Sequence, residues 1–155
     1  MGKINLARVF LGGLLAGLIL NIFEYVLNGV VFAAQWQAFE KMLGRQMRPG
    51  AVPFFIGLGF AMGIGMVWLY AAVRPRLGPG PKTAILTGLA FWFFAYAIPA
   101  ADDVMAGLVP GRMTVAITLI LVVGVPLSSL SACLALPRNR QPLIRAMSFG
   151  KNVLP

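Results

Sequence analysis

Four apolar runs, each close to the length that crosses a bilayer, constrain this chain more than any other feature. They occupy residues 9–32, 52–73, 83–98 and 114–136, and the third is the shortest. The hydrocarbon core of a bilayer is about 30 Å thick and takes roughly 20 apolar residues per helix. The runs are continuous, whereas a barrel strand alternates over about 10 residues, and helices satisfy their own backbone in lipid. We therefore predict an all-α polytopic membrane protein, a bundle of four transmembrane helices.

Composition supports a membrane protein and sets the domain division. Hydrophobic residues make up 59% of the chain and charged residues 11%, and the mean hydropathy of +0.86 is far above that of a soluble domain. We divide the chain into a four-helix transmembrane domain, residues 1–137, and a basic cytoplasmic tail, residues 138–155. The first apolar run exceeds the apolar core of a signal peptide, about 7 to 15 residues, so we expect it to be retained.

The distribution of charge predicts the orientation. Of the 13 Lys and Arg residues, nine flank the termini or lie between the second and third runs, and four lie on the opposite side. By the positive-inside rule we expect both termini in the cytoplasm, with the protein in a bacterial inner membrane. The cations are scattered over short loops without a recognition fold, so a nucleic acid partner is not expected.

Few residues of the chain carry chemistry. There is no His, and Cys133 is the single Cys, which excludes His-ligated metals, a His general base and an internal disulfide. Asp102 and Asp103 are adjacent but lack the oxygen cluster of a calcium loop, so helix capping is the preferred interpretation. We expect neither catalytic residues nor a metal site, and no small-molecule substrate.

Polar residues interrupt the first run on one helical face. Gly13, Gly17, Asn21, Glu24 and Asn28 are spaced four, four, three and four residues apart. We call Asn21, Glu24 and Asn28 the polar seam. It is either a proton or cation site, since intramembrane acids are functional candidates by default, or a polar clasp between helices. Its alignment with the two glycines favours the clasp, and without a nearby cation we expect a largely protonated Glu24 that hydrogen-bonds to both asparagines.

Small residues follow two neighbouring faces of the second run. Gly57, Ala61 and Gly65 form one track, and Gly59 and Gly63 form the other. Two tracks predict contact with two neighbouring helices, or with one helix and a flat cofactor or lipid. Tight helix packing is the preferred interpretation.

Aromatic and basic residues are candidates for lipid or partner contact. Trp36 and Phe39 belong to an apolar stripe that predicts a short helix in the outer interface. Trp92 and Phe93 lie in "FWFFAY", which covers almost every face of the third helix before Pro99 is expected to end it. A pigment or quinone contact there is an alternative to an aromatic girdle. In the tail, cations suited to lipid head groups or a partner subunit are Arg138, Arg140, Arg145 and Lys151.

Two segments carry a resemblance to known proteins. The stretches "INLARVFLGGLLAGLILNIFEYVLNGVV" and "VWLYAAVRPRLGPGPKTAILTGLAFWFFAY" together resemble an uncharacterised family of small bacterial four-helix integral membrane proteins. The similarity covers roughly residues 4–100 and is most specific in the polar first helix and the "RPRLGPGPKTA" loop. The resemblance implies the four-helix fold and supplies no activity.

Three functions remain open at this point. The first is a non-catalytic accessory subunit of a larger membrane complex, of photosynthetic reaction-centre or respiratory type, with other subunits and phospholipids as partners. The second is a small transporter or channel that uses Glu24 as a proton or cation site. The third is a membrane enzyme or redox carrier, for which Glu24, Asp102, Asp103 and Cys133 show no acid–base pairing.

Overall fold

The computed structural model describes residues 5–135, and every element in this range is helical. Four helical spans are long and apolar enough to cross a membrane, which confirms the predicted all-α polytopic bundle. The first is α1 continued by the π-helical segment η1, the second is α3, the third is α4, η2 and α5 in one line, and the fourth is α6. The bounds are α1 Leu6–Glu24, η1 Tyr25–Val31, α2 Ala33–Leu43, α3 Ala51–Leu77, α4 Pro81–Trp92, η2 Phe93–Ala97, α5 Ile98–Met105 and α6 Gly111–Ala135.

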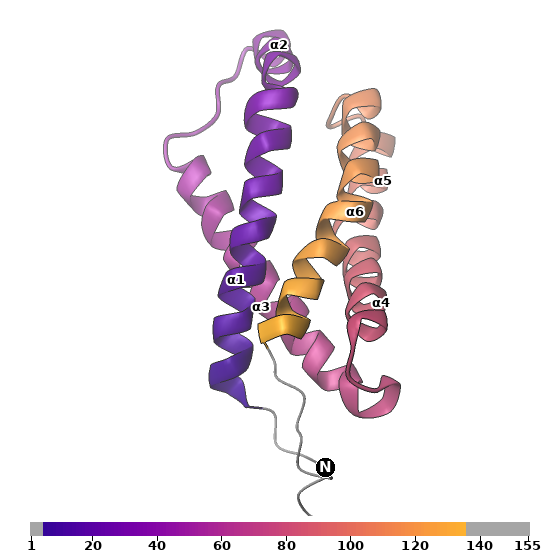
Figure 1. Ribbon diagram of the computed structural model, residues 1–155. Helices are drawn as coiled ribbons and strands as arrows, with labels where there is room; N and C mark the ends of the chain where they lie inside the picture. Colours follow the sequence, from indigo (N-terminus) through magenta and orange to yellow (C-terminus); the bar gives the residue numbers. More distant parts are fainter. Residues whose placement is uncertain (1–4, 136–155) are drawn as a thin grey trace, which may run out of the picture.

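The helices form two pairs that share one core. Figure 1 shows α3 crossing α1 obliquely, and α6 running beside α4 and α5. The short helix α2 lies at the end of the bundle where a loop connects α5 to α6. The largest fully buried side chains come from the first, second and fourth spans and include Leu20, Met66, Tyr70, Leu121 and Val125. Fewer than half of the residues in the most apolar stretch of each span are buried within the described chain, which leaves surface for lipid or other proteins.

The second and third spans both continue beyond their expected ends. Helix α3 runs through Pro75 to Leu77, four residues beyond the expected end at residue 73. The prediction that Pro99 ends the third span is wrong, because the span continues to Met105. Pro99 lies in the first turn of α5, directly after η2. Its missing N–H costs little there, because the π-helical segment has already shifted the backbone hydrogen-bonding pattern of the helix. Asp102 and Asp103 consequently lie within α5 instead of opening a loop.

A three-residue loop joins α3 to α4, as the proline- and glycine-rich "RPRLGPGPK" predicts. Gly78 has a φ of 81° and Gly80 a φ of 152°, backbone angles that residues with a Cβ rarely adopt. The Thr83 hydroxyl donates to the Gly78 carbonyl at 2.7 Å and satisfies a group at the end of α3. The loop makes the second and third spans antiparallel neighbours.

Helix α2 occurs where the short interfacial helix was predicted. The chain bends at Phe32, and α2 ends at Gly44, which is left-handed with a φ of 62°. None of the α2 side chains is fully buried. The tail residues Arg138, Arg140, Arg145 and Lys151, for which lipid or partner contact was predicted, lie outside the described residues.

Candidate functional site

Helices α1 and α3 approach each other closely where they cross, at three of the predicted small residues. A Cβ added to Gly13 would lie 2.5 Å from the Ile64 Cα, and one added to Gly17 would lie 2.7 Å from the Phe60 Cα. From the other side, a Cβ on Gly63 would lie 2.5 Å from the Gly13 carbonyl oxygen. Only hydrogen fits at these positions, so the helix backbones themselves are in contact.

The small-residue track formed by Gly57, Ala61 and Gly65 of α3 has a different environment. No atom outside its own helix lies within 4 Å of a Cβ built on Gly57, and Ala61 is exposed. Gly65 approaches one other helix, with its added Cβ 4.0 Å from the Phe91 ring. Within residues 5–135, the expected second neighbour is therefore missing along most of this track.

Asn28 of the polar seam belongs to a chain of hydrogen bonds that ends on Glu24. The Trp36 indole donates to the Asn28 side-chain oxygen at 3.1 Å, and the Asn28 amide donates to the Glu24 Oε2 at 2.7 Å. The Tyr96 hydroxyl also hydrogen-bonds to the Glu24 carboxyl group. Among the described residues, no Lys or Arg forms an ion pair with Glu24. We call Glu24, Asn28, Trp36 and Tyr96 the Glu24 cluster.

The three cluster residues that belong to membrane spans all lie at π-helical segments. Glu24 is the last residue before η1, Asn28 lies inside η1, and Tyr96 lies inside η2. The Phe32 N–H bonds to the Leu27 carbonyl at 2.8 Å, five residues back, as a π-helix requires. This wider turn changes which side chains face a neighbouring helix. The π-helical segments thus set the direction of the side chains that meet at Glu24.

Asn21 takes a different role from the one expected. We predicted a hydrogen bond between Asn21 and Glu24, and the structure contradicts it. The Asn21 amide donates to the Gly17 carbonyl at 2.9 Å and to the Ile56 carbonyl of α3 at 3.2 Å. Asn21 lies one turn closer to the glycine crossing, where the α3 backbone is within its reach, so it joins α1 to α3 instead of extending the cluster.

Tyr96 is the cluster member that the sequence analysis missed. It was counted only among the rings of the aromatic segment "FWFFAY". The available signal was its hydroxyl, because Tyr96 and Trp92 are the two residues of that segment whose side chains can donate a hydrogen bond to a carboxyl group. A helical wheel with 3.6 residues per turn does not direct Tyr96 toward the first span, since η2 alters the turn.

The predicted contact residues divide into internal and exposed groups. Trp36 and Trp92 are half-buried against the core, and the Trp92 indole donates to the Thr118 carbonyl of α6 at 2.8 Å. Phe39 packs edge-on against Trp36, with ring centroids 6.2 Å apart. Phe93 is exposed and packs against Phe94. The structure thus assigns the two tryptophans to helix packing and leaves Phe93 for lipid or a partner.

Metal-binding residues do not gather in the described part of the chain. No group of three or more Cys, Asp or Glu side chains lies close enough to hold an ion among residues 5–135. The side chains of Asn28 and Tyr96 hydrogen-bond to Glu24. The chemistry that this arrangement supports is hydrogen bonding.

Comparisons with known proteins do not assign the chain to a family. A scan against protein-family models finds no match, and searches of curated proteins and of solved structures find none either. Function must therefore be inferred from the geometry of the chain.

Proposed function

We propose that this chain is a non-catalytic accessory subunit of a larger membrane protein complex, of photosynthetic reaction-centre or respiratory type. The observation that carries the proposal is that side chains of the same chain hydrogen-bond to the carboxyl group of Glu24. Its carboxyl group is held by Asn28 of the first span and Tyr96 of the third, and Trp36 links α2 to the same cluster. A half-buried acid that is held by side chains of two different helices acts as a clasp between them.

The uncovered faces of the bundle support a partner. The first half of α3 exposes Phe54, Phe55 and Leu58 beside the open Gly57 and Ala61. A small-residue track flanked by large apolar side chains is the surface on which transmembrane helices pack closely. A neighbouring subunit would cover a face that the described chain leaves open. Helix packing and lipid contacts at this face are the means by which the subunit would stabilise an assembly.

Gentle extraction of the protein tests the proposal. The chain is solubilised from its native membrane in mild detergent, sized, and examined for proteins that co-purify with it. We expect a particle larger than the chain with other subunits in defined ratios, and a lone monomer would sink the proposal. Ala61→Phe fills the open track and is expected to reduce co-purification, whereas Ala72→Phe, at an exposed position near the other end of α3, serves as the matched control.

A second candidate is a small transporter or channel in which Glu24 binds a proton or a cation. The observation that favours it is the position of the acid between two π-helical segments, because such segments are rare and frequently occur at functional sites. Proton-coupled uptake into liposomes distinguishes the two functions. Transport should be abolished by Glu24→Gln and retained by Glu40→Gln on α2, and uptake that survives Glu24→Gln would contradict this candidate.

We also propose a bacterial inner membrane as the location, with both termini in the cytoplasm. The excess of cations at the end of the bundle opposite α2 supports this orientation. Arg74, Arg76 and Lys82 flank the α3–α4 loop at that end.

A further inference from the structure

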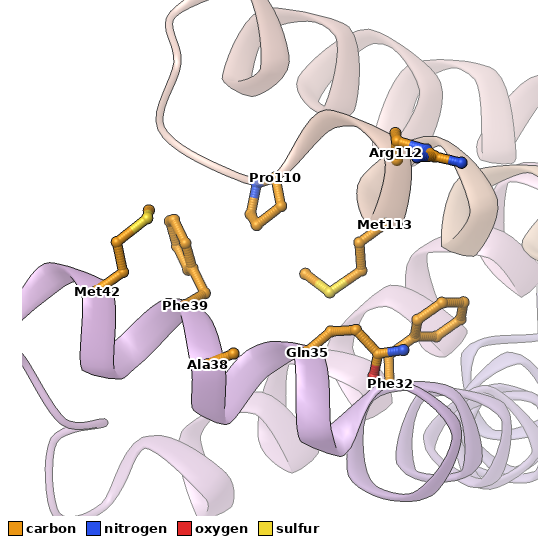
Figure 2. A pocket seen from close by; sticks show the side chains of 8 residues that line it. All are labelled: Phe32, Gln35, Ala38, Phe39, Met42, Pro110, Arg112 and Met113. Atoms are coloured by element: carbon orange, nitrogen blue, oxygen red, sulfur yellow. The ribbon is translucent and has the colours of Figure 1, made fainter.

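A groove lies between α2 and the turn that leads into α6. Figure 2 shows side chains of α2 on one wall facing Pro110 and Met113 on the other. The volume of the groove is about 670 Å³, within the usual range of small-molecule sites, about 300 to 1,000 Å³. It is separate from the Glu24 cluster, because none of the four cluster residues lines it.

The lining of the groove is apolar with a polar edge. Two methionines supply flexible thioethers that adapt to an irregular chain. Arg112 lies at one edge, beyond Met113, and is exposed (Figure 2). Gln35 adds an amide, and none of the lining residues is acidic. The apolar lining residues are Phe32, Ala38, Phe39, Met42, Pro110 and Met113.

The groove lies at the level where the transmembrane helices end. The first span ends at Val31, just before Phe32, and the fourth begins at Gly111, just before Arg112. Phe32 and Arg112 therefore both lie within two residues of a span end, which places the groove at the boundary between the hydrocarbon and head-group layers. An apolar chain with a negatively charged head matches this arrangement, because its two parts meet the two parts of the groove.

We propose that the groove binds an anionic phospholipid, with an acyl chain between α2 and Met113 and the phosphate at Arg112. Charge complementarity favours this occupant. Arg112 forms no ion pair with the acids among residues 5–135, so its charge is free to pair with a phosphate. This site does not depend on the proposed function, since an accessory subunit or a transporter would carry it equally.

Lipid retention by the purified full-length chain tests the proposal. The chain is delipidated in mild detergent and offered phosphatidylglycerol or phosphatidylcholine with identical acyl chains, and native mass spectrometry counts the lipids retained. We expect phosphatidylglycerol to be retained roughly fivefold more strongly, the preference typical of one cation near the head group. Equal retention of the two lipids by the unmodified chain would overturn the proposal.

Two pairs of variants locate the site. Arg112→Gln should abolish the preference for phosphatidylglycerol, whereas Arg48→Gln, the same charge change in the α2–α3 loop, should preserve it. Met42→Gln should weaken retention of both lipids, whereas Leu43→Gln, at an exposed residue outside the groove, should not. Identical behaviour within either pair counts against the groove. All four positions are exposed, and circular dichroism verifies that helix content is unchanged.

A competition experiment separates a lipid from a free phosphate. Inorganic phosphate or glycerol phosphate is added at increasing concentration to the lipid-bound protein. We expect no displacement, because the acyl chain supplies the apolar contacts. Displacement by either ion would indicate a phosphate site that does not use the groove and would refute the proposal. A protein that replaces the lipid on this surface during co-purification would refute it as well.

Discussion

Glu24 is the residue whose chemistry most affects how the spans of this chain are held together. A carboxyl group within a transmembrane span is costly unless other polar groups satisfy it. Here Asn28 donates at 2.7 Å from one turn along the same span, and Tyr96 approaches from the third span. The long-range bond to Tyr96 is the one that holds two spans together, because the bond to Asn28 stays within a single span.

Removing the Tyr96 hydroxyl should therefore loosen the bundle. We expect Tyr96→Phe to lower the free energy of unfolding by about 1 kcal/mol, the usual size of such a bond in a membrane protein. Tyr25→Phe is the matched control, because Tyr25 is 69% exposed and lies beside Glu24 in the sequence. Unfolding by denaturant in mixed micelles measures both. Equal stability of the two variants would contradict a clasp at Tyr96.

Glycine is required at the α1–α3 crossing because the other helix leaves no room for a Cβ. Gly63→Ala places a methyl group against the Gly13 carbonyl and the Gly17 backbone, so the helices must separate. We expect a loss of about 1 to 3 kcal/mol in the free energy of unfolding, as for other overpacked contacts. Gly57→Ala on the same helix meets open space and should leave stability unchanged or slightly raised. Thermal unfolding of the purified variants measures the difference, and a harmless Gly63→Ala would show that the crossing is loose.

The existence of the spans follows from the sequence, and their ends and local pitch do not. Length and hydropathy are sufficient to place four helices, because the bilayer sets both. The ends were misplaced because α3 continues through Pro75 and the third span continues through Pro99, since proline is tolerated near a helix terminus and after a π-helical segment. Neither π-helical segment has a sequence signature that we recognised. The partnership of Glu24 with Tyr96 consequently emerged only from the structure.

Helix α2 should lie at the membrane surface with Trp36 turned inward. In the double variant Trp68→Phe, Trp92→Phe, all indole fluorescence comes from Trp36. We expect lipids brominated near the head group to quench it more strongly than lipids brominated near the chain end, because Trp36 reaches Asn28 just inside the end of the first span. Stronger quenching by the deep bromines would place α2 inside the hydrocarbon layer. Since Trp92 bonds to Thr118, circular dichroism must first show an intact fold.

At the scale of the whole molecule, backbone contact and side-chain hydrogen bonds connect the four spans. Backbone contact at the glycine crossing joins α1 to α3, the Glu24 cluster joins the first span to the third, and the bond from Trp92 to Thr118 joins the third span to α6. The small-residue tracks were visible in the sequence, but which of them would be used depended on the crossing geometry. Gly59 and Gly63 are buried against α1, while Gly57 and Ala61 remain open. The open track is a surface for packing that only an assembly can test.

The orientation of the bundle yields the last prediction. An even number of spans places both termini on one side, and the cations near the α3–α4 loop favour the cytoplasm for that side. In a Cys133→Ser background, Arg48→Cys in the α2–α3 loop should react with a membrane-impermeant maleimide added to intact cells. Pro79→Cys in the α3–α4 loop should react only after the membrane is opened. Both positions are exposed, so a difference in labelling reports the side of the membrane and not burial. The opposite labelling pattern would invert the orientation and move the lipid groove to the cytoplasmic leaflet.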